Sequence, residues 1–156
     1  MALSIRPAAR RDLPAIVRLW REMWDLHVPL DDRFAPGPEA DLVMRDYVDG
    51  HLDSDRSRVM VAEEEGRVLG YALGTILVNP AVVVHPEFGY VSDVAVTAST
   101  RRRGIGSRLL EALHDWFRAK GLRSAEVQVS VRNREARAFW RRKGYTDFLE
   151  RLHCRL

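Results

Sequence analysis

The sequence is poor in cysteine, in metal-binding motifs and in long apolar segments. Cys154 is the single cysteine among 156 residues, which excludes an intramolecular disulfide and leads us to expect a reducing, cytoplasmic setting. No segment approaches the ~18–20 apolar residues that cross a bilayer, and residues 1–7 lack the apolar core of a signal peptide. We therefore expect no membrane partner. Neither H-E-x-x-H nor C-x-x-C occurs, so we expect no metal.

Length and composition are those of one globular domain, expected over residues 1–156. Hydrophobic residues make up 46% and charged residues 30% of the chain, which argues against disorder, collagen and low complexity. Residues 1–100 hold 10 Lys and Arg against 16 Asp and Glu, a net −6, whereas residues 101–156 hold 15 against 6, a net +9. This asymmetry indicates an anionic ligand for the second part and a cationic one for the first, unless folding mixes both into a solvated surface.

The hydropathy pattern predicts a mixture of helices and strands. Apolar residues at helical spacing predict a helix after the N-cap Asp12 and further helices over residues 39–52, 106–120 and 134–143. Short apolar runs predict strands over residues 3–6, 59–62, 68–78, 89–97, 125–131 and 145–153. The order β-α-α-β-β-β-α-β-α-β implies an α/β or α+β fold with helices covering a twisted sheet. In the second helix, Leu42, Tyr47 and Val48 are expected to face inward. In the helix over residues 106–120, the expected buried face consists of Leu109, Leu110, Leu113, Trp116 and Phe117.

The most informative stretch joins the strand over residues 89–97 to the helix that starts at Gly106. Written from Val94 it reads VAVTASTRRRGIGS, so three arginines precede two glycines. Glycines let a backbone approach a ligand closely, and the free N–H groups at a helix start favour an anion. Ser107 adds a hydroxyl donor, so we predict a phosphate-binding turn; a basic, solvated helix start is the alternative. The Walker and G-x-G-x-x-G patterns are both absent, which argues against an ATPase or a dinucleotide site.

The motif Arg101-x-x-Gly104-x-Gly106 after an apolar strand resembles the R/Q-x-x-G-x-G/A signature of the GNAT superfamily of N-acetyltransferases. The segment NREARAFWRRKGY, from Asn133 to Tyr145, is similar to that family's N-x-x-A-x-x-x-Y-x-x-x-G-F segment. The order of elements also matches, so the resemblance covers nearly the whole chain. It implies the GNAT fold, with a mixed, mostly antiparallel sheet of six or seven strands and four flanking helices.

The resemblance also implies that acetyl-CoA is the acetyl donor. Its pyrophosphate would be held by the turn, at Arg101, Arg102, Arg103, Gly104, Ile105, Gly106 and Ser107. The pantetheine arm would lie along the main chain of Val94, Ala95 and Val96, where the strands of Val94 and Val129 separate. Asn133 would bond the arm, cap the following helix, or do both. Trp140 would line the pantetheine channel.

The implied chemistry is direct attack of a primary amine on the thioester, through a tetrahedral intermediate. An amine of pKa ~10 must first lose a proton. Asp93 is the only acid in an otherwise apolar strand, so it is our candidate for the base or for a carboxylate that holds a water; a structural role is the alternative. Ser92 stands where many relatives carry a glutamate, and Trp140 where many carry an acidic tyrosine. The acid is therefore water or an unidentified residue, because Tyr145 is expected in the core.

The acceptor is the least constrained part of the site. The resemblance places it beside the loop between the first two helices, where Asp31 and Asp32 could hold a cationic amine of a small molecule or peptide; pairing with Arg33 or simple solvation is the alternative. A second functional hypothesis is an acyl-CoA-binding sensor without catalysis, because the usual glutamate and tyrosine are missing. No nucleic-acid partner is expected, since the arginines form no recognised binding motif. A homodimer is compatible with the sequence, which does not determine the oligomeric state.

Overall fold

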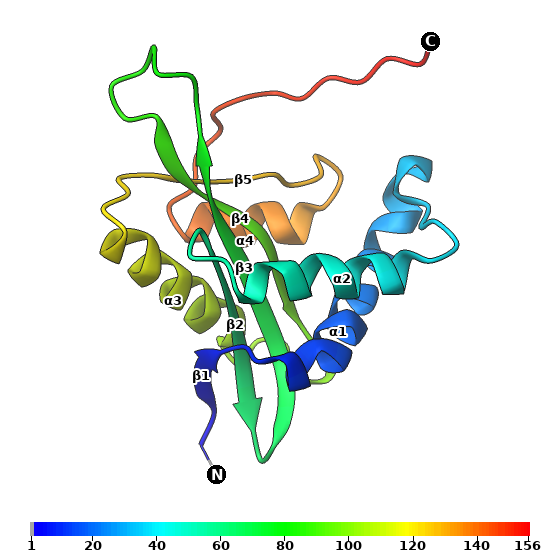
Figure 1. Cartoon of the computed structure of the whole chain (residues 1–156). Coiled ribbons are helices and arrows are strands. Elements are labelled where there is room, and N and C mark those ends of the chain that lie inside the picture. Colours follow the sequence, from blue (N-terminus) through cyan, green and yellow to red (C-terminus); the bar gives the residue numbers. More distant parts are fainter. Residues whose placement is uncertain (1) are drawn as a thin grey trace.

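A computed structural model describes residues 2–156 and contains one five-stranded sheet. The strands lie in the order β1-β2-β3-β4-β5; neighbours are antiparallel except β5, which runs parallel to β4. Their bounds are β1 Ser4–Pro7, β2 Ser57–Glu64, β3 Arg67–Val78, β4 Glu87–Val96 and β5 Ala125–Val127 (Figure 1). The strands β2 and β3 form a hairpin whose turn has Glu65 and Gly66 at positive φ.

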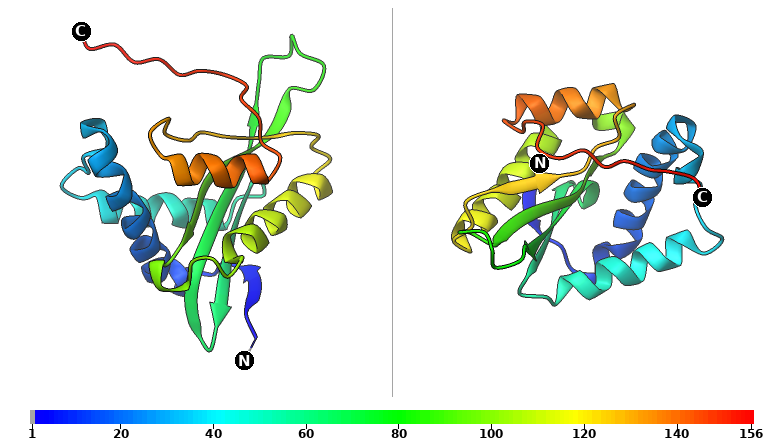
Figure 2. Two further views of the ribbon diagram at one scale, coloured as in Figure 1. Left: turned by 180° about the vertical axis from the view of Figure 1, so that it is seen from behind. Right: turned by 90° about the horizontal axis from the view of Figure 1, so that it is seen from above.

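Four helices cover the two faces of the sheet (Figure 2). The helices α1 Leu13–His27 and α2 Ala40–Leu52 pack on one face, and α3 Ile105–Ala119 and α4 Arg134–Arg142 pack on the other. The connections contain the short 3-10 turns η1 Arg10–Asp12, η2 Val28–Leu30, η3 Asp32–Phe34 and η4 Ala98–Thr100. Side chains alternate along each strand, so Tyr71 belongs to the core under α1 and Ala72 to the core under α3. No helix within residues 2–156 is both long and apolar enough to cross a membrane.

The predicted inward face is confirmed for α3 and partly wrong for α2. In α3 the predicted apolar residues are all buried, namely Leu109, Leu110, Leu113, Trp116 and Phe117. In α2, Val48 is buried, but Leu42 and Tyr47 are 61% and 46% exposed, and Met44 takes an inward position instead. Residues four apart share a helix face, and Leu42 is turned about 200° from Met44. Because α2 touches the sheet along one narrow stripe, several apolar residues outside the stripe face solvent.

The predicted last strand over residues 145–153 does not form. Residues 145–156 have no regular secondary structure, so the sheet has five strands rather than six or seven. The segment leaves the end of α4 and extends past the sheet (Figure 1). A strand exists only where a neighbouring edge accepts its hydrogen bonds, and the local sequence cannot supply that edge.

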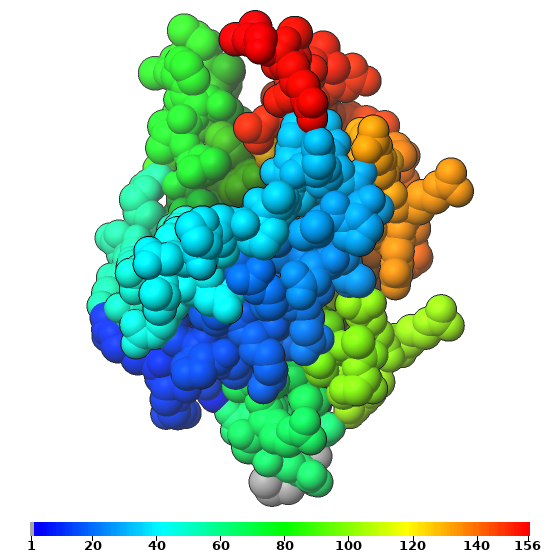
Figure 3. Space-filling view, turned by 90° about the vertical axis from the view of Figure 1, so that its right-hand side faces the viewer, coloured from blue at the N-terminus to red at the C-terminus, as the bar shows by residue number. Residues whose placement is uncertain are grey.

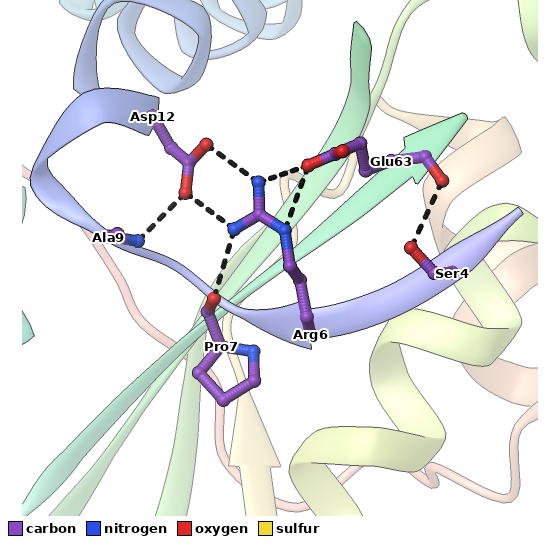
Figure 4. A network of polar contacts seen from close by, with 6 residues as sticks. All are labelled: Ser4, Arg6, Pro7, Ala9, Asp12 and Glu63. Atoms are coloured by element: carbon purple, nitrogen blue, oxygen red, sulfur yellow. Dashed lines mark hydrogen bonds and ion pairs between the residues drawn. The ribbon is translucent and has the colours of Figure 1, made fainter. Parts of the chain in front are cut away.

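An arginine network ties β1 to the start of α1 and to β2 (Figure 4). Arg6 Nη1 donates to Asp12 Oδ2 at 2.8 Å, and Arg6 Nε donates to Glu63 Oε2 at 2.8 Å. Asp12 also accepts a hydrogen bond from the Ala9 N–H at 2.8 Å. Asp12 therefore precedes α1 as predicted, but its side chain caps the 3-10 turn before the helix rather than the helix itself. The hydrogen bond from Arg6 holds the pKa of the buried Asp12 carboxyl below its usual value.

Candidate active site

A β-bulge in β4 marks the centre of the predicted site. Leu73 pairs with Asp93, whereas the next residue of β3, Gly74, pairs with Val91, so Ser92 is an extra residue in β4. Bulges bend a strand and redirect the side chains beside them, and they are frequent next to active sites. Asp93 follows the extra residue directly and therefore lies where the strand changes direction.

The strands β4 and β5 separate beyond this bulge, as predicted. Their pairing ends at Val91 and Val127, although β4 continues to Val96. On its other side β4 stays paired, with Val94 opposite Ala72. The edge of β4 over residues 94–96 is therefore not paired with β5. An extended arm of a ligand can add to such an edge through main-chain hydrogen bonds.

Asp93 has the surroundings of a carboxyl group that titrates near neutrality. Its Oδ2 accepts a hydrogen bond from Tyr71 Oη at 3.0 Å, and its Oδ1 has no hydrogen-bond partner among residues 2–156. Burial raises the pKa of Asp93 to about 6, while the Tyr71 hydrogen bond and the nearby His27 oppose the rise. Burial and the charge of Asp93 also raise the pKa of Tyr71, so Tyr71 stays a neutral donor.

His27, at the end of α1, and Asn133, just before α4, lie next to each other, although 106 residues separate them. Asn133 Oδ1 accepts the Ala136 N–H at 3.0 Å, so the predicted cap of α4 is confirmed. This bond turns Asn133 Nδ2 toward His27 Nε2, at 3.4 Å. The other ring nitrogen, Nδ1, lies 3.0 Å from the Met23 carbonyl oxygen and can only donate to it. In the neutral ring, Nε2 is therefore the acceptor and faces the Asn133 amide.

The sequence analysis missed His27 and Tyr71. His27 ends α1, and it lowers the pKa of Asp93 together with Tyr71. Its ring packs against Phe34, with ring centroids 5.4 Å apart, and Phe34 also packs against Trp24. The position of His27 at a predicted helix end, just before the acceptor loop, was the available signal.

The predicted phosphate-binding turn has the required backbone. Gly104 has φ 74°, a left-handed conformation that favours glycine, and it is the N-cap of α3. A Cβ at Gly104 would meet nothing within 4 Å, so open space lies above the first turn of the helix. The N–H groups of Ile105, Gly106 and Ser107 belong to this first turn and have no helical acceptor. Together with the helix dipole they favour an anion at this position, in agreement with the sequence-based expectation.

The three arginines of the turn differ in their partners. Arg103 donates two hydrogen bonds to Glu64, at 3.1 and 2.7 Å, so its charge is compensated. Arg101 and Arg102 are exposed, and no ion pair is found for either within the part of the chain that the structure describes. Glu22 of α1 fixes the start of the turn by accepting from Thr97 Oγ1 at 3.1 Å and from the Ala98 N–H at 3.3 Å. Arg101 and Arg102 are therefore the cations left for a ligand.

Trp140 lies in the core beside α3 and is 9% exposed. Its ring meets Phe139 and Tyr145 edge to face, with centroids 5.1 and 5.0 Å away. Tyr145 is partly buried in the same core, as predicted, and its hydroxyl lies 2.7 Å from His114 Nε2. A Cβ on Gly106 would lie 3.7 Å from Phe139, so α4 packs against the start of α3 through this ring.

Asp31 and Asp32 are both engaged by arginines. Asp31 binds Arg33 through its side chain and backbone N–H and lies 3.5 Å from Arg132, while Asp32 lies 2.8 Å from Arg155. The hydrogen bonds from Arg33 hold the pKa of Asp31 far below its usual value. The two carboxylates line an open hollow of about 510 Å³ together with Pro29, Leu30, Arg33, Arg132, His153 and Arg155. Within residues 2–156 no cluster of His, Cys, Asp and Glu could hold a metal ion.

Comparison with known proteins agrees with this geometry. The model of the "Acetyltransferase (GNAT) family" matches residues 15–145. An uncharacterized N-acetyltransferase of Bacillus subtilis, YhfO, is 28% identical over 153 residues, which cover 93% of this chain and 91% of that protein. A crystal structure of a variant of the BH1408 protein from Bacillus halodurans shares the fold, with a TM-score of 0.88, 22% identity and coverage of 98% of this chain and 99% of that chain.

Two further solved structures carry ligands. A predicted acetyltransferase from Clostridium acetobutylicum with acetyl-CoA has a TM-score of 0.80 and 17% identity, over 99% of this chain and 96% of that chain. The aminoglycoside N-acetyltransferase AAC(6')-Iy in complex with CoA has a TM-score of 0.76 and 20% identity, over 99% and 95%. At these identities the likeness concerns the fold. The match of the family model to most of the sequence shows that the chain belongs to the GNAT acetyltransferase family.

Proposed function

We propose that the protein transfers the acetyl group of acetyl-CoA directly to a primary amine of a small molecule or peptide. The observation that carries this proposal is the position of Asp93, a partly buried carboxyl group with pKa of about 6 beside the edge of β4 that β5 leaves unpaired. Membership of an acetyltransferase family and a relative of the fold crystallised with acetyl-CoA support the donor.

The residues present fit acetyl-CoA. The open space above Gly104, the free N–H groups up to Ser107 and the uncompensated Arg101 and Arg102 suit the pyrophosphate. The main chain of residues 94–96 suits the pantetheine arm, with Asn133 and Trp140 on the α4 side. The bound donor supplies an activated acyl group and a thiolate leaving group.

Asp93 would accept the proton that the amine must lose. At neutral pH most of this carboxyl is ionised, and its higher pKa makes it a stronger base than an ordinary aspartate. Tyr71 would hold Oδ2, which leaves Oδ1 for the amine or for a water. Backbone N–H groups at residues 94–96 would stabilise the negative charge that develops on the acyl oxygen. No proton is required from Trp140, because a thiol of pKa ~8.5 leaves readily as thiolate.

The acceptor is proposed to approach over η2 and η3. Aminoglycoside acetyltransferases with the same fold, one in complex with sisomicin, support a small cationic amine. Such an amine would bind Asp32 in exchange for Arg155, and Asp31 in exchange for the more distant Arg132, while Arg33 stays on Asp31. The aromatic rings of Trp24 and Phe34, which meet edge to face, lie next to η3.

A screen of primary amines with acetyl-CoA and a thiol reagent tests the proposal. Cys154 is exposed and would react with the reagent, so the assay protein should be Cys154→Ser. We expect release of free CoA that depends on the amine and is lost in Asp93→Asn. Binding of acetyl-CoA without turnover of any amine would instead support an acyl-CoA sensor.

A further inference from the structure

Three side chains of β4 and β5 share the face of the sheet that α1 and α2 cover. Asp93 is opposite Leu73 and Tyr90 is opposite Thr75, and residues directly opposite each other in paired strands lie on one face. Leu73 belongs to the core under α1, so Asp93 and Tyr90 are on that side. Glu126 of β5 pairs with Tyr90 and shares its face. The row Asp93, Tyr90, Glu126 therefore lies on the side from which the acceptor is proposed to approach.

Glu126 is a half-buried carboxylate without a cation. Neither an ion pair nor a side-chain hydrogen bond of Glu126 is found in the part of the chain that the structure describes. Arg151 reaches the same part of β5, but it donates to the neutral side chain of Gln128, at 3.1 Å. By contrast, Asp31 and Asp32 are each paired with an arginine already. A charge partly removed from water is stabilised by a counter-ion, so Glu126 is available to the cation of a ligand.

Tyr90 separates the two carboxyl groups of the row. Burial raises the pKa of Tyr90, and the charges of Asp93 and Glu126 add to the rise, so Tyr90 lies near both of them. Tyr47 of α2 adds to the rise and therefore lies close as well, whereas Arg151 opposes it. Tyr47 is 46% exposed, so its ring can contact a ligand. An aromatic surface thus lies between two anionic groups.

The spacing of the row follows from the strand register. Asp93 and Tyr90 are opposite residues two apart on β3, which is about 7 Å along the strand, and β5 lies about 4.8 Å to the side. The main-chain positions of Asp93 and Glu126 are therefore about 8 Å apart. An extended chain advances about 1.2 Å per bond, so two nitrogen atoms separated by about five carbon atoms span most of this distance.

The row lies beneath the C-terminal segment, residues 146–156. This segment crosses from β5 to η3, because Arg151 bonds Gln128 and Arg155 bonds Asp32. Figure 3 shows a hollow at this end of the molecule, framed by the C-terminal segment (red), the β3–β4 hairpin (green) and the loop between α1 and α2 (light blue). A small, extended molecule can enter such a hollow, whereas a folded protein surface cannot.

We propose that the acceptor is a primary amine with a second cationic group about five carbons away, and that Glu126 binds this second group. The inference rests on the proposed acetyl transfer and names its substrate class. Asp93 takes the proton of the reacting amine, as proposed above, while the second ammonium group keeps its protons. The alkyl chain lies against Tyr90 and Tyr47, whose rings contact methylene groups and attract cations. The order anion, ring, anion in the site thus matches the order cation, alkyl chain, cation in an α,ω-diamine.

Three amines of similar length test the second group, because their far ends differ in charge. They are 1,5-diaminopentane with a cationic end, pentylamine with a neutral end and 6-aminohexanoate with an anionic end. In the wild type, kcat/KM for CoA release should be about tenfold or more higher for the diamine than for pentylamine, and lowest for 6-aminohexanoate. The difference should appear mainly in KM, because Glu126 binds a group that does not react. A preference for 6-aminohexanoate would mean that Arg151 binds the far end and would overturn the proposal.

The variant Glu126→Gln keeps the shape of the side chain and removes its charge. The ratio of kcat/KM for 1,5-diaminopentane to that for pentylamine should therefore fall close to one. Glu111→Gln is the matched control, because it removes a carboxylate from α3 on the opposite face of the sheet, and it should keep the wild-type ratio. An unchanged ratio in Glu126→Gln would refute the role of Glu126.

Failure of this inference differs from failure of the proposed function. Turnover of all three amines with equal kcat/KM would leave acetyl transfer intact and overturn only the second cationic group. No release of CoA with these or any other amine of the screen would contradict acetyl transfer itself, and this inference with it.

Discussion

Asp93 shows how one residue acquires a reactive setting from its neighbours. An aspartate in water has pKa ~3.9 and is a weak base. Burial beside the bulge raises its pKa to about 6, and the hydrogen bond from Tyr71 together with His27 limits the rise. The carboxylate is therefore ionised at neutral pH and still basic enough to take a proton.

Replacement of Asp93 by asparagine should lower kcat/KM by about 10²-fold or more, because the amide cannot accept the amine proton. In the wild type, kcat/KM should rise with pH through about 6 as the carboxyl group ionises. This rise should be absent from the pH profile of Asp93→Asn. Binding of acetyl-CoA should be unchanged. Activity within a few-fold of wild type, with an unmoved pH profile, would make Asp93 structural.

Removal of the Tyr71 hydroxyl should shift the rise of kcat/KM to higher pH. The hydrogen bond from Tyr71 stabilises the ionised form of Asp93, so in Tyr71→Phe the pKa of Asp93 should rise. The midpoint of log kcat/KM against pH measures the shift. Tyr90→Phe is the control, because Tyr90 makes no hydrogen bond to Asp93 in the described structure, and its midpoint should stay near the wild-type value. Equal midpoints in all three proteins would exclude this role for Tyr71.

Site residues could be predicted where local sequence carries the signal. Asp93 is the one acid of an apolar strand, and Asn133 precedes a helix at the capping position, so both could be identified. Tyr71 and His27 could not, because their partners lie 22 and 106 residues away. Glu22 was missed for the same reason, since it meets Thr97 only after α1 has packed beside β4.

At the scale of elements, the residue bounds of helices could be predicted from local periodicity. The packing partners of the elements could not. The helix α3 begins one residue before its predicted start, because its apolar spacing and its glycines act within the segment. The failures at α2 and at residues 145–153 both concern what an element packs against. An alternating pattern identifies a segment that is able to form a strand. Whether a neighbouring strand is free to pair with it depends on the rest of the fold.

The phosphate-binding turn gives a prediction for an element. Acetyl-CoA should raise the melting temperature of the wild type, because it binds only the native state. Gly104→Glu should abolish this rise by placing a negative charge where the phosphates bind. Gly104→Ala is the control: it carries the same backbone strain at φ 74°, about 1 kcal/mol, without the charge. Thermal melts with and without acetyl-CoA measure both. If Gly104→Glu keeps the full shift, the pyrophosphate binds elsewhere.

At the scale of the whole molecule, the fold mixes the acidic first part of the chain with the basic second part. Ion pairs join Glu64 to Arg103 and Asp32 to Arg155, and each pair crosses residue 100. These intramolecular ion pairs neutralise part of the excess positive charge of residues 101–156. The predicted anionic ligand would therefore interact with the arginines that have no acidic partner. Of the three arginines in the turn, Arg103 is paired with Glu64, so two arginines without an acidic partner remain.

The Arg6 network gives a prediction for the stability of the whole molecule, because it joins β1, β2 and the start of α1. Arg6→Met should leave the Asp12 carboxylate buried without its cation and lower the free energy of unfolding at pH 7 by about 3 kcal/mol. The pKa of Asp12 is lowered in the folded state, so its contribution is present above about 3.8 and is lost as pH falls further. The difference in the free energy of unfolding between wild type and Arg6→Met, measured by urea unfolding, should therefore shrink from pH 7 to pH 3.

Arg10→Met is the control. Arg10 also binds two carboxylates, Asp49 and Asp53, but it does so at the surface. Its replacement should therefore change the free energy of unfolding little at either pH. Equal losses of unfolding free energy in Arg6→Met and Arg10→Met would mean that the burial of Asp12 does not determine how much the Arg6 network stabilises the fold.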